Sequence, residues 1–213
     1  MPAREHKHVA LLDPAAVSAV AALEDDPFYR SICAGFAGDQ TRRRQALAQY
    51  FDYSIQEGTA FGRSLHLPKP AQGVAVWRLP QPAEVQAHAA HNKRLFLQTT
   101  LDAEGCANYQ RIVDFMSGKA AGVVDRKAWY LSIVAVDPMA QGRGLGRRLL
   151  EPTISEADSV SATCYLETFS ARNLPFYELL GFAAEARFTE PTTGADYVVM
   201  VRHPGTAKAR GTP

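Results

Sequence analysis

The sequence predicts a mixed α/β fold, with a mostly antiparallel central sheet, helices on both of its faces and one βαβ unit. Two observations carry this prediction. An almost continuously apolar stretch at 129–136 is followed by a Gly-rich turn, a helical pattern and a second strand at 162–168, and strands connected in this way run parallel. Apolar runs on either side of this unit, at 59–79 and 182–202, are interrupted by Gly and Pro, which is typical of antiparallel neighbours.

Bulk properties place the chain among ordinary soluble proteins. Of its 213 residues 46% are hydrophobic and 21% charged, and the formal net charge is +1, so no overall attraction draws it to nucleic acid or to anionic membranes. No apolar run approaches the roughly 20 residues that span a bilayer. No apolar signal core follows the basic start. We therefore expect a cytoplasmic protein, as a monomer or a homodimer.

A chain of this length forms one domain with a sizeable core. We predict a single domain at 9–203, between a flexible N-terminus at 1–8 and a flexible tail at 204–213 that is rich in Gly, Thr, Lys and Arg. The three cysteines are odd in number and widely spaced, which favours reduced thiols over a disulfide framework or a metal site. They are Cys33, Cys106 and Cys164.

The first half of the chain is mostly helical in pattern. Two Asp-Pro pairs, at 13–14 and 26–27, combine an N-cap residue with a proline at the first helical position. A third helix is predicted at 41–56 from the spacing of its apolar residues. The arginines at 42–44 oppose the dipole of that helix. Solvation and an acidic ligand both remain open as explanations.

The elements that follow alternate between strands and helices. Strands at 59–65 and 73–79 are predicted to form a hairpin, and the pattern from Ala83 to Gly118 is helical. In that stretch His88 and His91 stand one turn apart, but no third ligand accompanies them, so we expect solvent-facing histidines and no metal. The remaining elements are a strand at 129–136, a helix at 141–157, a strand at 162–168, a helix at 175–180 and strands at 182–188 and 197–202.

The Gly-rich turn at 137–148 is the strongest signal in the sequence. Glycines alternate at 142, 144 and 146, where the chain leaves a strand and enters a helix. Main-chain N–H groups in such a turn converge on an anion, and the positive end of the helix dipole assists them. Arg143, Arg147 and Arg148 add positive charge. The turn therefore predicts pyrophosphate binding.

Two other phosphate-binding motifs fit this turn less well. A dinucleotide fingerprint requires glycine at its first, third and sixth positions, and the sixth position counted from Gly142 is Arg147. A P-loop requires Gly-Lys followed by Ser or Thr, and the turn contains no lysine. A purely structural glycine turn is the remaining alternative.

The spacing from Val134 to Gly146 resembles the acetyl-CoA motif of the GNAT acetyltransferase superfamily. The later stretches Leu166–Thr168 and Asn173–Phe182 resemble the closing motif of that superfamily. The combination is similar in particular to the puromycin N-acetyltransferase branch, with which two further stretches agree, Val74–Trp77 and Ala128–Leu131. The resemblance identifies the cofactor half of the protein better than the acceptor half, and it implies a GNAT-like fold.

The resemblance also implies residues that bind acetyl-CoA as a cosubstrate. Main-chain groups of a strand would hold the pantetheine arm, and N–H groups of the turn would hold the pyrophosphate. The superfamily often places a CoA-contacting Asn seven residues before the catalytic Tyr, but here that position is Ser170, and Asn173 stands four residues before Tyr177. The implied residues are Val134, Ala135, Val136, Gln141, Gly142, Arg143, Gly144, Leu145, Gly146, Arg147, Ser170 and Asn173.

Two catalytic residues follow from the same resemblance. Tyr177 matches the tyrosine that protonates the departing thiolate, although it stands in an apolar cluster and packing is an alternative. Glu167 ends a strand where many relatives carry the base, although an ion pair at the strand end is an alternative. Cys164 could act as the nucleophile of a ping-pong route, but we expect it to be a small residue of the core.

The function implied is direct transfer of an acetyl group from acetyl-CoA to the primary amine of a small molecule. We expect the segments at 35–53 and 83–118 to frame the acceptor site. Two other functions remain open. One is a non-catalytic acyl-CoA-binding or regulatory module, and the other is an enzyme that acetylates a protein N-terminus or lysine.

Overall fold

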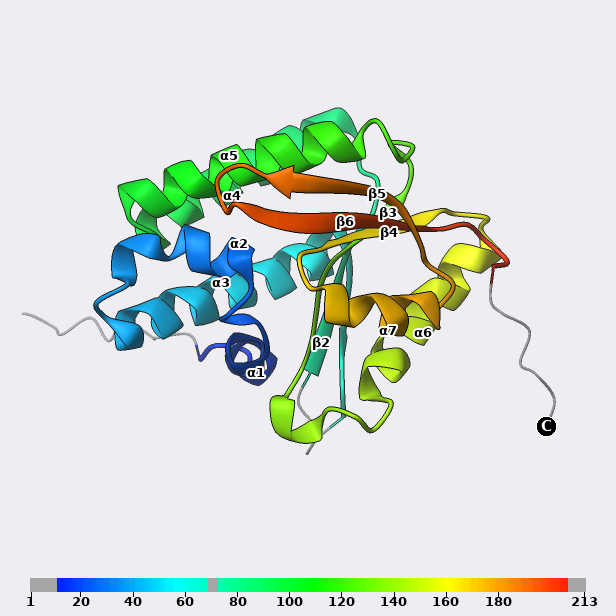
Figure 1. Cartoon of the computed structure of the whole chain (residues 1–213), viewed down its shortest axis with the longest axis horizontal. Helices are drawn as coiled ribbons and strands as arrows, with labels where there is room; N and C mark the ends of the chain where they lie inside the picture. Colours follow the sequence, from blue (N-terminus) through cyan, green and yellow to red (C-terminus); the bar gives the residue numbers. More distant parts are fainter. Residues whose placement is uncertain (1–10, 69–72, 207–213) are drawn as a thin grey trace, which may run out of the picture.

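The computed structural model describes residues 11–68 and 73–206. Its six strands form one sheet in the order β1-β2-β3-β4-β6-β5, in which only β3 and β4 are parallel neighbours (Figure 1). The predicted mixed, mostly antiparallel sheet with one βαβ unit is therefore confirmed. The strands are β1 (Gly62–His66), β2 (Gly73–Arg78), β3 (Trp129–Val136), β4 (Cys164–Thr168), β5 (Ala183–Glu190) and β6 (Ala195–Arg202).

Helices cover both faces of the sheet, as predicted. One face packs against the first five helices through a core that we call the first cluster, with Phe51, Ile112 and Tyr197 among its buried members. The other face packs against the last two helices through a second cluster, which includes Trp77 and Leu150. The helices are α1 (Pro14–Leu23), α2 (Pro27–Ile32), α3 (Gln40–Phe61), α4 (Ala83–Thr100), α5 (Ala103–Ala120), α6 (Leu145–Ser159) and α7 (Leu174–Glu178).

The strand predicted to begin at Thr59 begins instead at Gly62, because α3 continues through Phe61. The Thr59 hydroxyl donates to the carbonyl of Ile55, 2.9 Å away, as a helical threonine does. At Gly62 the chain passes so close to β2 that an added Cβ would lie 2.0 Å from the main-chain oxygen of Trp77. The glycine is therefore where the helix ends and the strand begins.

The single helical pattern predicted from Ala83 to Gly118 is two helices. Helix α4 ends at Thr100, and the next residue, Leu101, is extended. Asp102 then caps α5, because its carboxylate accepts from the N–H of Gly105 at 2.8 Å. The apolar periodicity continues across this break, so the pattern alone concealed it.

Smaller boundary differences follow local bonding. The helix predicted to start at Gln141 starts at Leu145, after a turn in which Gly142 and Gly144 have positive φ values. Pro152 lies inside that helix without ending it. The strand predicted from Ala162 begins at Cys164, and the last two strands are longer than predicted.

The arginines at the start of α3 bind the end of α1. Arg44 donates to the Glu24 carboxylate at 2.7 and 2.9 Å, and Arg43 donates to the main-chain oxygen of the same residue. The Arg42 guanidinium lies 4.8 Å from the centre of the Phe36 ring. Contacts within the chain therefore account for these charges, in place of an acidic ligand.

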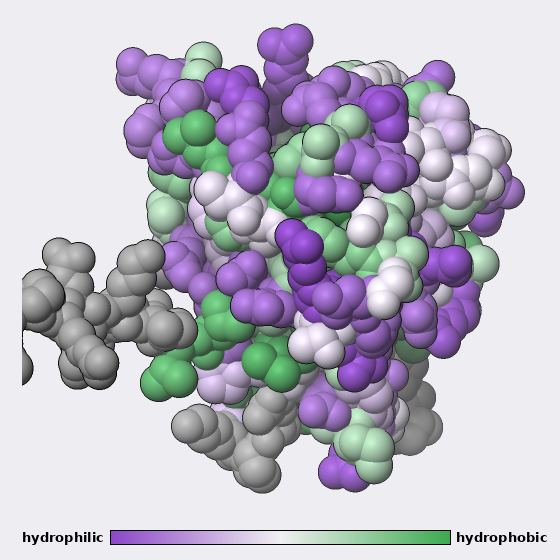
Figure 2. Space-filling model, turned by 90° about the vertical axis from the view of Figure 1, so that its left-hand side faces the viewer, coloured by the Kyte–Doolittle hydropathy of each residue, from purple (hydrophilic) through white to green (hydrophobic). Residues whose placement is uncertain are grey.

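Both ends predicted to be flexible lie largely outside the described residues, which start at 11 and end at 206. Gly205, within the predicted tail, donates its N–H to the Asp158 carboxylate at 3.0 Å. The face that carries the left-hand helices of Figure 1 is mostly hydrophilic, with apolar side chains in small groups (Figure 2). Within the described part of the chain, no helix has the length and apolarity to cross a bilayer.

Candidate functional site

The sheet divides where β3 and β4 part. These parallel strands form only three residue pairs, from Trp129 with Cys164 to Leu131 with Leu166. Beyond Leu131, β3 continues to Val136 along β2 on its other side, and β4 continues to Thr168 along β6. Main-chain groups on the facing edges of both strands are left without a strand partner. Such an opening accepts an extended ligand in the manner of an added strand.

A β-bulge at Ser132 helps to create this opening. On β2, Val76 faces Ile133 while the next residue, Trp77, faces Leu131, so Ser132 is the additional residue on β3. A bulge bends its strand and reverses the alternation of side chains. Leu131 accordingly packs in the second cluster, whereas Ile133 packs in the first. The Ser132 hydroxyl donates to the main-chain oxygen of Val76 at 3.1 Å, which holds the bulge to β2.

The glycine-rich turn lies at the start of α6, the helix that links β3 to β4. Gly142 and Gly144 have φ values of +75° and +72°, which L side chains rarely adopt. Gly146 serves packing instead, because an added Cβ there would lie 3.1 Å from the Phe176 ring. The alternation of glycines thus has two different physical causes.

The turn presents main-chain N–H groups that have no acceptor among the described residues. Gly144 caps α6 without a side chain, and the first intrahelical bond is from Arg148 N–H to the Gly144 carbonyl. The N–H groups from Gly144 to Arg147 therefore remain available at the positive end of a helix of 15 residues. Arg143 and Arg147 are exposed beside them. This arrangement fits a phosphate-bearing ligand.

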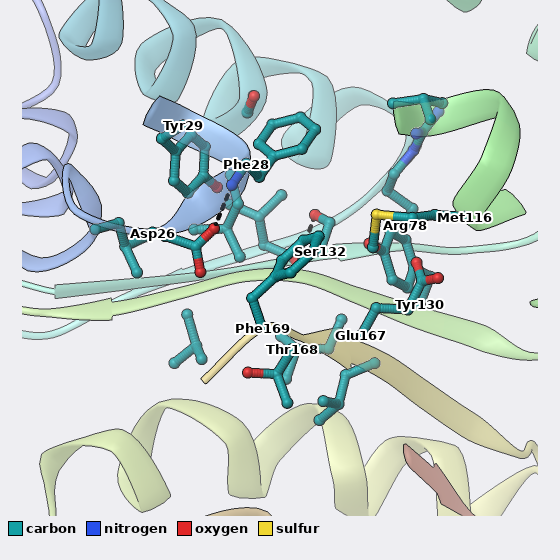
Figure 3. Close-up of a pocket in the computed structure, with 18 of the residues that line it drawn as sticks. Asp26, Phe28, Tyr29, Arg78, Met116, Tyr130, Ser132, Glu167, Thr168 and Phe169 are labelled. Atoms are coloured by element: carbon teal, nitrogen blue, oxygen red, sulfur yellow. Dashed lines mark hydrogen bonds between the residues drawn. The ribbon is translucent and has the colours of Figure 1, made fainter. Parts of the chain in front are cut away.

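A cavity of about 280 Å³ lies behind the opening, between the sheet and the helices of the first cluster. It is lined by residues from helices α1 to α5 and α7, from strands β2, β3 and β4 and from the segment after β4, and eight of the lining residues are aromatic. In Figure 3, Asp26 and Tyr29 lie at one end, Arg78, Tyr130 and Glu167 lie at the other, and Ser132 and Phe169 lie between them. Its aromatic residues are Phe28, Tyr29, Tyr50, Tyr109, Tyr130, Tyr165, Phe169 and Tyr177.

Tyr177 reaches the cavity from α7, on the opposite face of the sheet. The centre of its ring lies 5.1 Å from that of Phe176 and 6.1 Å from that of Phe182. Tyr177 therefore does pack in an apolar cluster, as the alternative interpretation of the sequence held. It also lines the cavity. Burial raises the pKa of Tyr177 well above its ordinary value, and the negative charge of Asp26 adds to the rise. The phenol therefore keeps its proton across the physiological range.

Glu167 faces the cavity from the end of β4. Burial raises the pKa of Glu167 to about 7, and a hydrogen bond from Tyr130 opposes the rise. One carboxylate oxygen, Oε1, is buried and has no hydrogen-bond partner among the described residues. The ion-pair alternative does not apply, because none of the salt bridges within the described ranges includes Glu167. A carboxyl group with a pKa near 7 is suited to taking a proton.

Asp26 is a cavity residue that the sequence did not reveal as one. It caps α2, and its Oδ1 accepts from the Phe28 N–H at 2.9 Å (Figure 3). Burial raises the pKa of Asp26 to about 6. After burial, the negative charge of Asp26 is the next largest cause of the raised pKa values of Tyr29 and Tyr177. The sequence predicted only the cap.

The far end of the cavity contains two cations that sequence reasoning also missed. Lys93 of α4 is buried, donates to the Ser54 hydroxyl at 3.0 Å and lies 3.5 Å from the Glu57 carboxylate. Burial lowers the pKa of Lys93 to about 8. Arg78 ends β2 and has neither a hydrogen bond nor an ion pair to any residue of the described ranges. Neither residue belongs to a sequence motif, so only the fold places them here.

The structure brings together some of the predicted site residues and separates others. Tyr177, Glu167, Asn173 and Val134 all line the cavity, whereas Ser170 does not. Several predicted residues lie outside the cavity lining, along β3 and the turn that follows it: Ala135, Val136, Gln141, Gly142, Arg143, Gly144, Leu145, Gly146 and Arg147.

Two of these residues are already bonded within the chain. The Gln141 side chain donates to the Val136 carbonyl at 3.0 Å, which ties the turn to the strand. Arg147 lies 2.6 Å from Glu151 on the surface of α6. The segments expected to frame the acceptor site contribute Tyr50 from the first and Lys93, Tyr109, Val113, Met116 and Ser117 from the second. His88 and His91 are exposed.

A sheet that divides beside a glycine-rich helix start, with a cavity behind the division, fits an α/β enzyme that binds a phosphate-bearing cosubstrate. The sequence profile of the acetyltransferase (GNAT) family matches residues 73–182. The chain belongs to this family, and it is an acetyltransferase. Enzymes of the family use acetyl-CoA. The matched range contains the opening, the turn and Tyr177.

Similar proteins agree with this assignment. An uncharacterized N-acetyltransferase of Schizosaccharomyces pombe is 26% identical over 199 residues, which are 90% of this chain and 79% of that protein. Among solved structures, a histone acetyltransferase HPA2 and related acetyltransferase from Corynebacterium glutamicum has a TM-score of 0.57 at 23% identity, covering 93% of this chain and 97% of that one. Arylalkylamine N-acetyltransferase 2 of Aedes aegypti has a TM-score of 0.59 at 15% identity, covering 89% and 93%. The two structural likenesses show a shared fold.

Proposed function

We propose that this acetyltransferase moves the acetyl group of acetyl-CoA directly to the primary amine of a small molecule. The observation that carries the proposal is the cavity behind the opening of the sheet, with eight aromatic residues in its lining. Helices α2 to α5 surround it, and a volume of about 280 Å³ suits a small acceptor better than a peptide chain. The main-chain groups of Val134, Ala135 and Val136 would bind the pantetheine arm, and the turn would bind the diphosphate.

In this proposal the residues of the cavity divide the proton transfers between them. A carboxylate, Glu167 or Asp26, takes the proton that the ammonium must lose before it attacks, since an alkylammonium of lysine-like pKa, about 10.4, is mostly charged at pH 7. Main-chain N–H groups at the bulge stabilise the oxyanion. Tyr177 gives its proton to the departing thiolate, and its raised pKa keeps that proton available.

Direct transfer is favoured over a route through a cysteine. Cys164 is completely buried in the second cluster, on the face of the sheet away from the cavity. Burial raises the pKa of its thiol to about 12. Such a thiol forms little of the nucleophilic thiolate. Cys33 is buried as well, and burial raises the pKa of Cys33 to about 11.

The acceptors to test first follow from two sources. The resemblance of Val74–Trp77 and Ala128–Leu131 to the puromycin branch supports aminoacyl nucleosides. The name of the Aedes aegypti neighbour supports arylalkylamines. Release of CoA thiol from acetyl-CoA, measured over a panel of these amines, of aliphatic amines and of short peptides, tests the proposal. Binding of acetyl-CoA without thiol release over the whole panel would instead indicate a non-catalytic acyl-CoA-binding module.

Tyr177→Phe tests the proposed acid. We expect kcat to fall by about 10²–10⁴-fold, because the thiolate loses its proton donor, while acetyl-CoA affinity is largely kept because the ring still packs. The control is Tyr53→Phe, whose ring stacks on Phe96 at 4.2 Å outside the cavity lining and whose turnover should be unchanged. Equal kcat in wild type and Tyr177→Phe would remove Tyr177 from the mechanism.

A further inference from the structure

Lys93 is a charged residue on the buried face of a mostly exposed helix. Of the 18 residues of α4, only Ala89, Lys93 and Leu97 are buried, and Lys93 is 7% exposed. Lysine is almost never buried in a folded protein unless its ammonium group is paired. Burial lowers the pKa of Lys93 to about 8, so the side chain is still mostly protonated at pH 7. A buried cation therefore lines the cavity.

Four residues of α3 hold the Lys93 ammonium group. Its nitrogen lies 4.5 Å from the ring centre of Tyr50 and 4.6 Å from that of Tyr53, within the range of cation–π contacts. It also lies 3.0 Å from the hydroxyl oxygen of Ser54 and 3.5 Å from a carboxylate oxygen of Glu57. Aromatic rings recognise the ammonium groups of ligands in the same way. We call these four residues of α3 the ammonium cage.

The ammonium cage belongs to the helical wall of the cavity. Three of its members, Tyr50, Ser54 and Glu57, line the cavity together with Lys93. In the proposed function the acetyl group enters on the other side, through the sheet, where β3 and β4 part. An acceptor whose amine meets the acetyl group at the sheet therefore extends its remaining atoms toward α3 and α4.

An occupied cage rejects a second ammonium group of the acceptor. Lys93 already takes the rings and the acid that would bind such a group, and the exposed Arg78 adds positive charge to the same lining. The other acids of the lining, Asp26 and Glu167, are the two candidates for the base that serves the reacting nitrogen. A second ammonium group would therefore be repelled by like charge and would lose water without gaining a partner. An uncharged group has neither cost.

We propose that the acceptor carries no positive charge besides that of its reacting amine, and that Lys93 enforces this by filling the ammonium cage. This inference rests on the proposed function and narrows its substrate class from amines in general to monoamines. Lys93 is then a specificity-determining residue that excludes diamines and polyamines. The uncharged end of the acceptor lies against the helical wall.

A matched pair of acceptors tests the proposal. 4-Ethylbenzylamine and 1,4-bis(aminomethyl)benzene have nearly the same shape, and an ammonium group of the second stands where the first has a methyl group. We expect the wild type to favour the monoamine by about 10- to 100-fold in kcat/KM. Lys93→Met should raise kcat/KM for the diamine, because the cage can then receive its second ammonium group, and should leave the monoamine near its wild-type value.

Further variants separate the charge of Lys93 from its packing. Lys93→Arg keeps the positive charge and should keep the preference of the wild type. In the double variant Lys93→Met/Glu57→Gln the gain for the diamine should be lost, because the cage then contains no acid. Arg94→Met removes an exposed arginine of α4 outside the cavity lining and should behave as wild type. Equal use of the two acceptors by the wild type, or an equal change for both in Lys93→Met, would overturn the proposal.

Calorimetric binding of the same two compounds provides a readout that does not depend on turnover. If the protein turns over no amine, the proposed function fails. A tighter binding of 4-ethylbenzylamine than of the diamine, with the difference removed in Lys93→Met, would still establish the exclusion by Lys93. Equal affinities for the two compounds, or binding of neither, would rule it out.

Discussion

Asp26 and Glu167 are both half-buried carboxyl groups of the cavity, and their surroundings differ. Asp26 accepts one main-chain N–H and lines the cavity with Tyr29 and Tyr177, whose pKa values its charge raises. Glu167 is hydrogen-bonded by Tyr130 and keeps one oxygen without a partner among the described residues. The environments raise the pKa of Asp26 to about 6 and that of Glu167 to about 7. Two groups with different pKa values in one site can be assigned by their pH dependence.

The pH profile of kcat/KM identifies the base. A base acts only when it is deprotonated, so the rate rises as the pH increases through its pKa. If Glu167 is the base, the rise is centred near pH 7, and Glu167→Gln removes it while lowering kcat/KM by about 10²–10⁴-fold. If the rise is centred near pH 6 and persists in Glu167→Gln, Asp26 is the base. Initial rates between pH 5 and pH 9, on the order of ten points, decide between them.

At the scale of elements, helix α6 combines two functions. Its buried residues Leu149, Leu150 and Ile154 hold it to the sheet, while its first turn remains open to solvent and carries unpaired N–H groups. A side-chain cap from Ser, Thr or Asp would occupy those N–H groups. Gly144 as the cap residue leaves them available, which is what an anion-binding helix start requires.

Gly144→Val separates strain from ligand binding. The φ value of +72° makes valine unfavourable by roughly 1–2 kcal/mol, which lowers Tm by about 2–8 °C in a chain of this size. We also expect the Tm increase produced by acetyl-CoA to be nearly abolished, because the side chain would stand where the diphosphate approaches. Thermal melting with and without acetyl-CoA measures both effects.

Gly194→Val is the matched control for that experiment. Gly194 has a φ value of +64° and open space around it, in the turn between β5 and β6. The same strain should therefore lower Tm while the shift produced by acetyl-CoA stays at the wild-type value. An undiminished shift in Gly144→Val would contradict the assignment of the turn.

The sequence predicted elements well where local chemistry determines them. The Asp-Pro starts of α1 and α2 and the βαβ unit are confirmed, because caps and periodicity act over a few residues. The end of α3 and the break before Asp102 were missed, because helical periodicity continued through both. The cavity is lined by Asp26, Arg78 and Lys93, which come from three different parts of the chain. A local sequence pattern cannot predict that such distant residues line the same cavity.

At the scale of the molecule, an ion pair between the buried Arg202 and the partly exposed Asp158 connects the last strand to α6. The Arg202 side chain is only 1% exposed, and it donates to both carboxylate oxygens of Asp158 at 2.6 and 2.8 Å and to the Leu180 carbonyl at 2.9 Å. These contacts join β6, α6 and the segment after α7. Hydrogen bonding from Arg202 holds the pKa of Asp158 below its ordinary value.

Asp158→Asn should destabilise the protein by about 3 kcal/mol, because it leaves a buried guanidinium without its counter-charge. Since the pKa of Asp158 is lowered in the folded state, its stabilisation is fully present above the unfolded pKa of about 3.9 and is lost as the pH falls through the folded pKa. Urea unfolding at pH 7 and at acidic pH measures both effects, and the difference between variant and wild type should shrink in acid.

Glu156→Gln provides the comparison, because it breaks the more exposed pair with Arg63, whose side chains are 38% and 46% exposed. Surface pairs contribute about 0–1 kcal/mol, so this variant should stay close to wild type. Equal losses in Asp158→Asn and Glu156→Gln would show that burial does not set the strength of the Asp158 pair.

The parting of β3 and β4 has a consequence for the stability of the whole protein. The sheet consists of two hydrogen-bonded groups of strands, β1-β2-β3 and β4-β6-β5. Three residue pairs between β3 and β4, at Trp129 to Leu131 of β3, join the two groups. A cosubstrate lying in the opening would bond to both edges and complete the ladder across it. Since such a ligand binds only the folded chain, a hundredfold excess over its Kd adds about 2.7 kcal/mol to the free energy of unfolding. The resistance of the chain to unfolding would then vary with the concentration of the molecule it consumes.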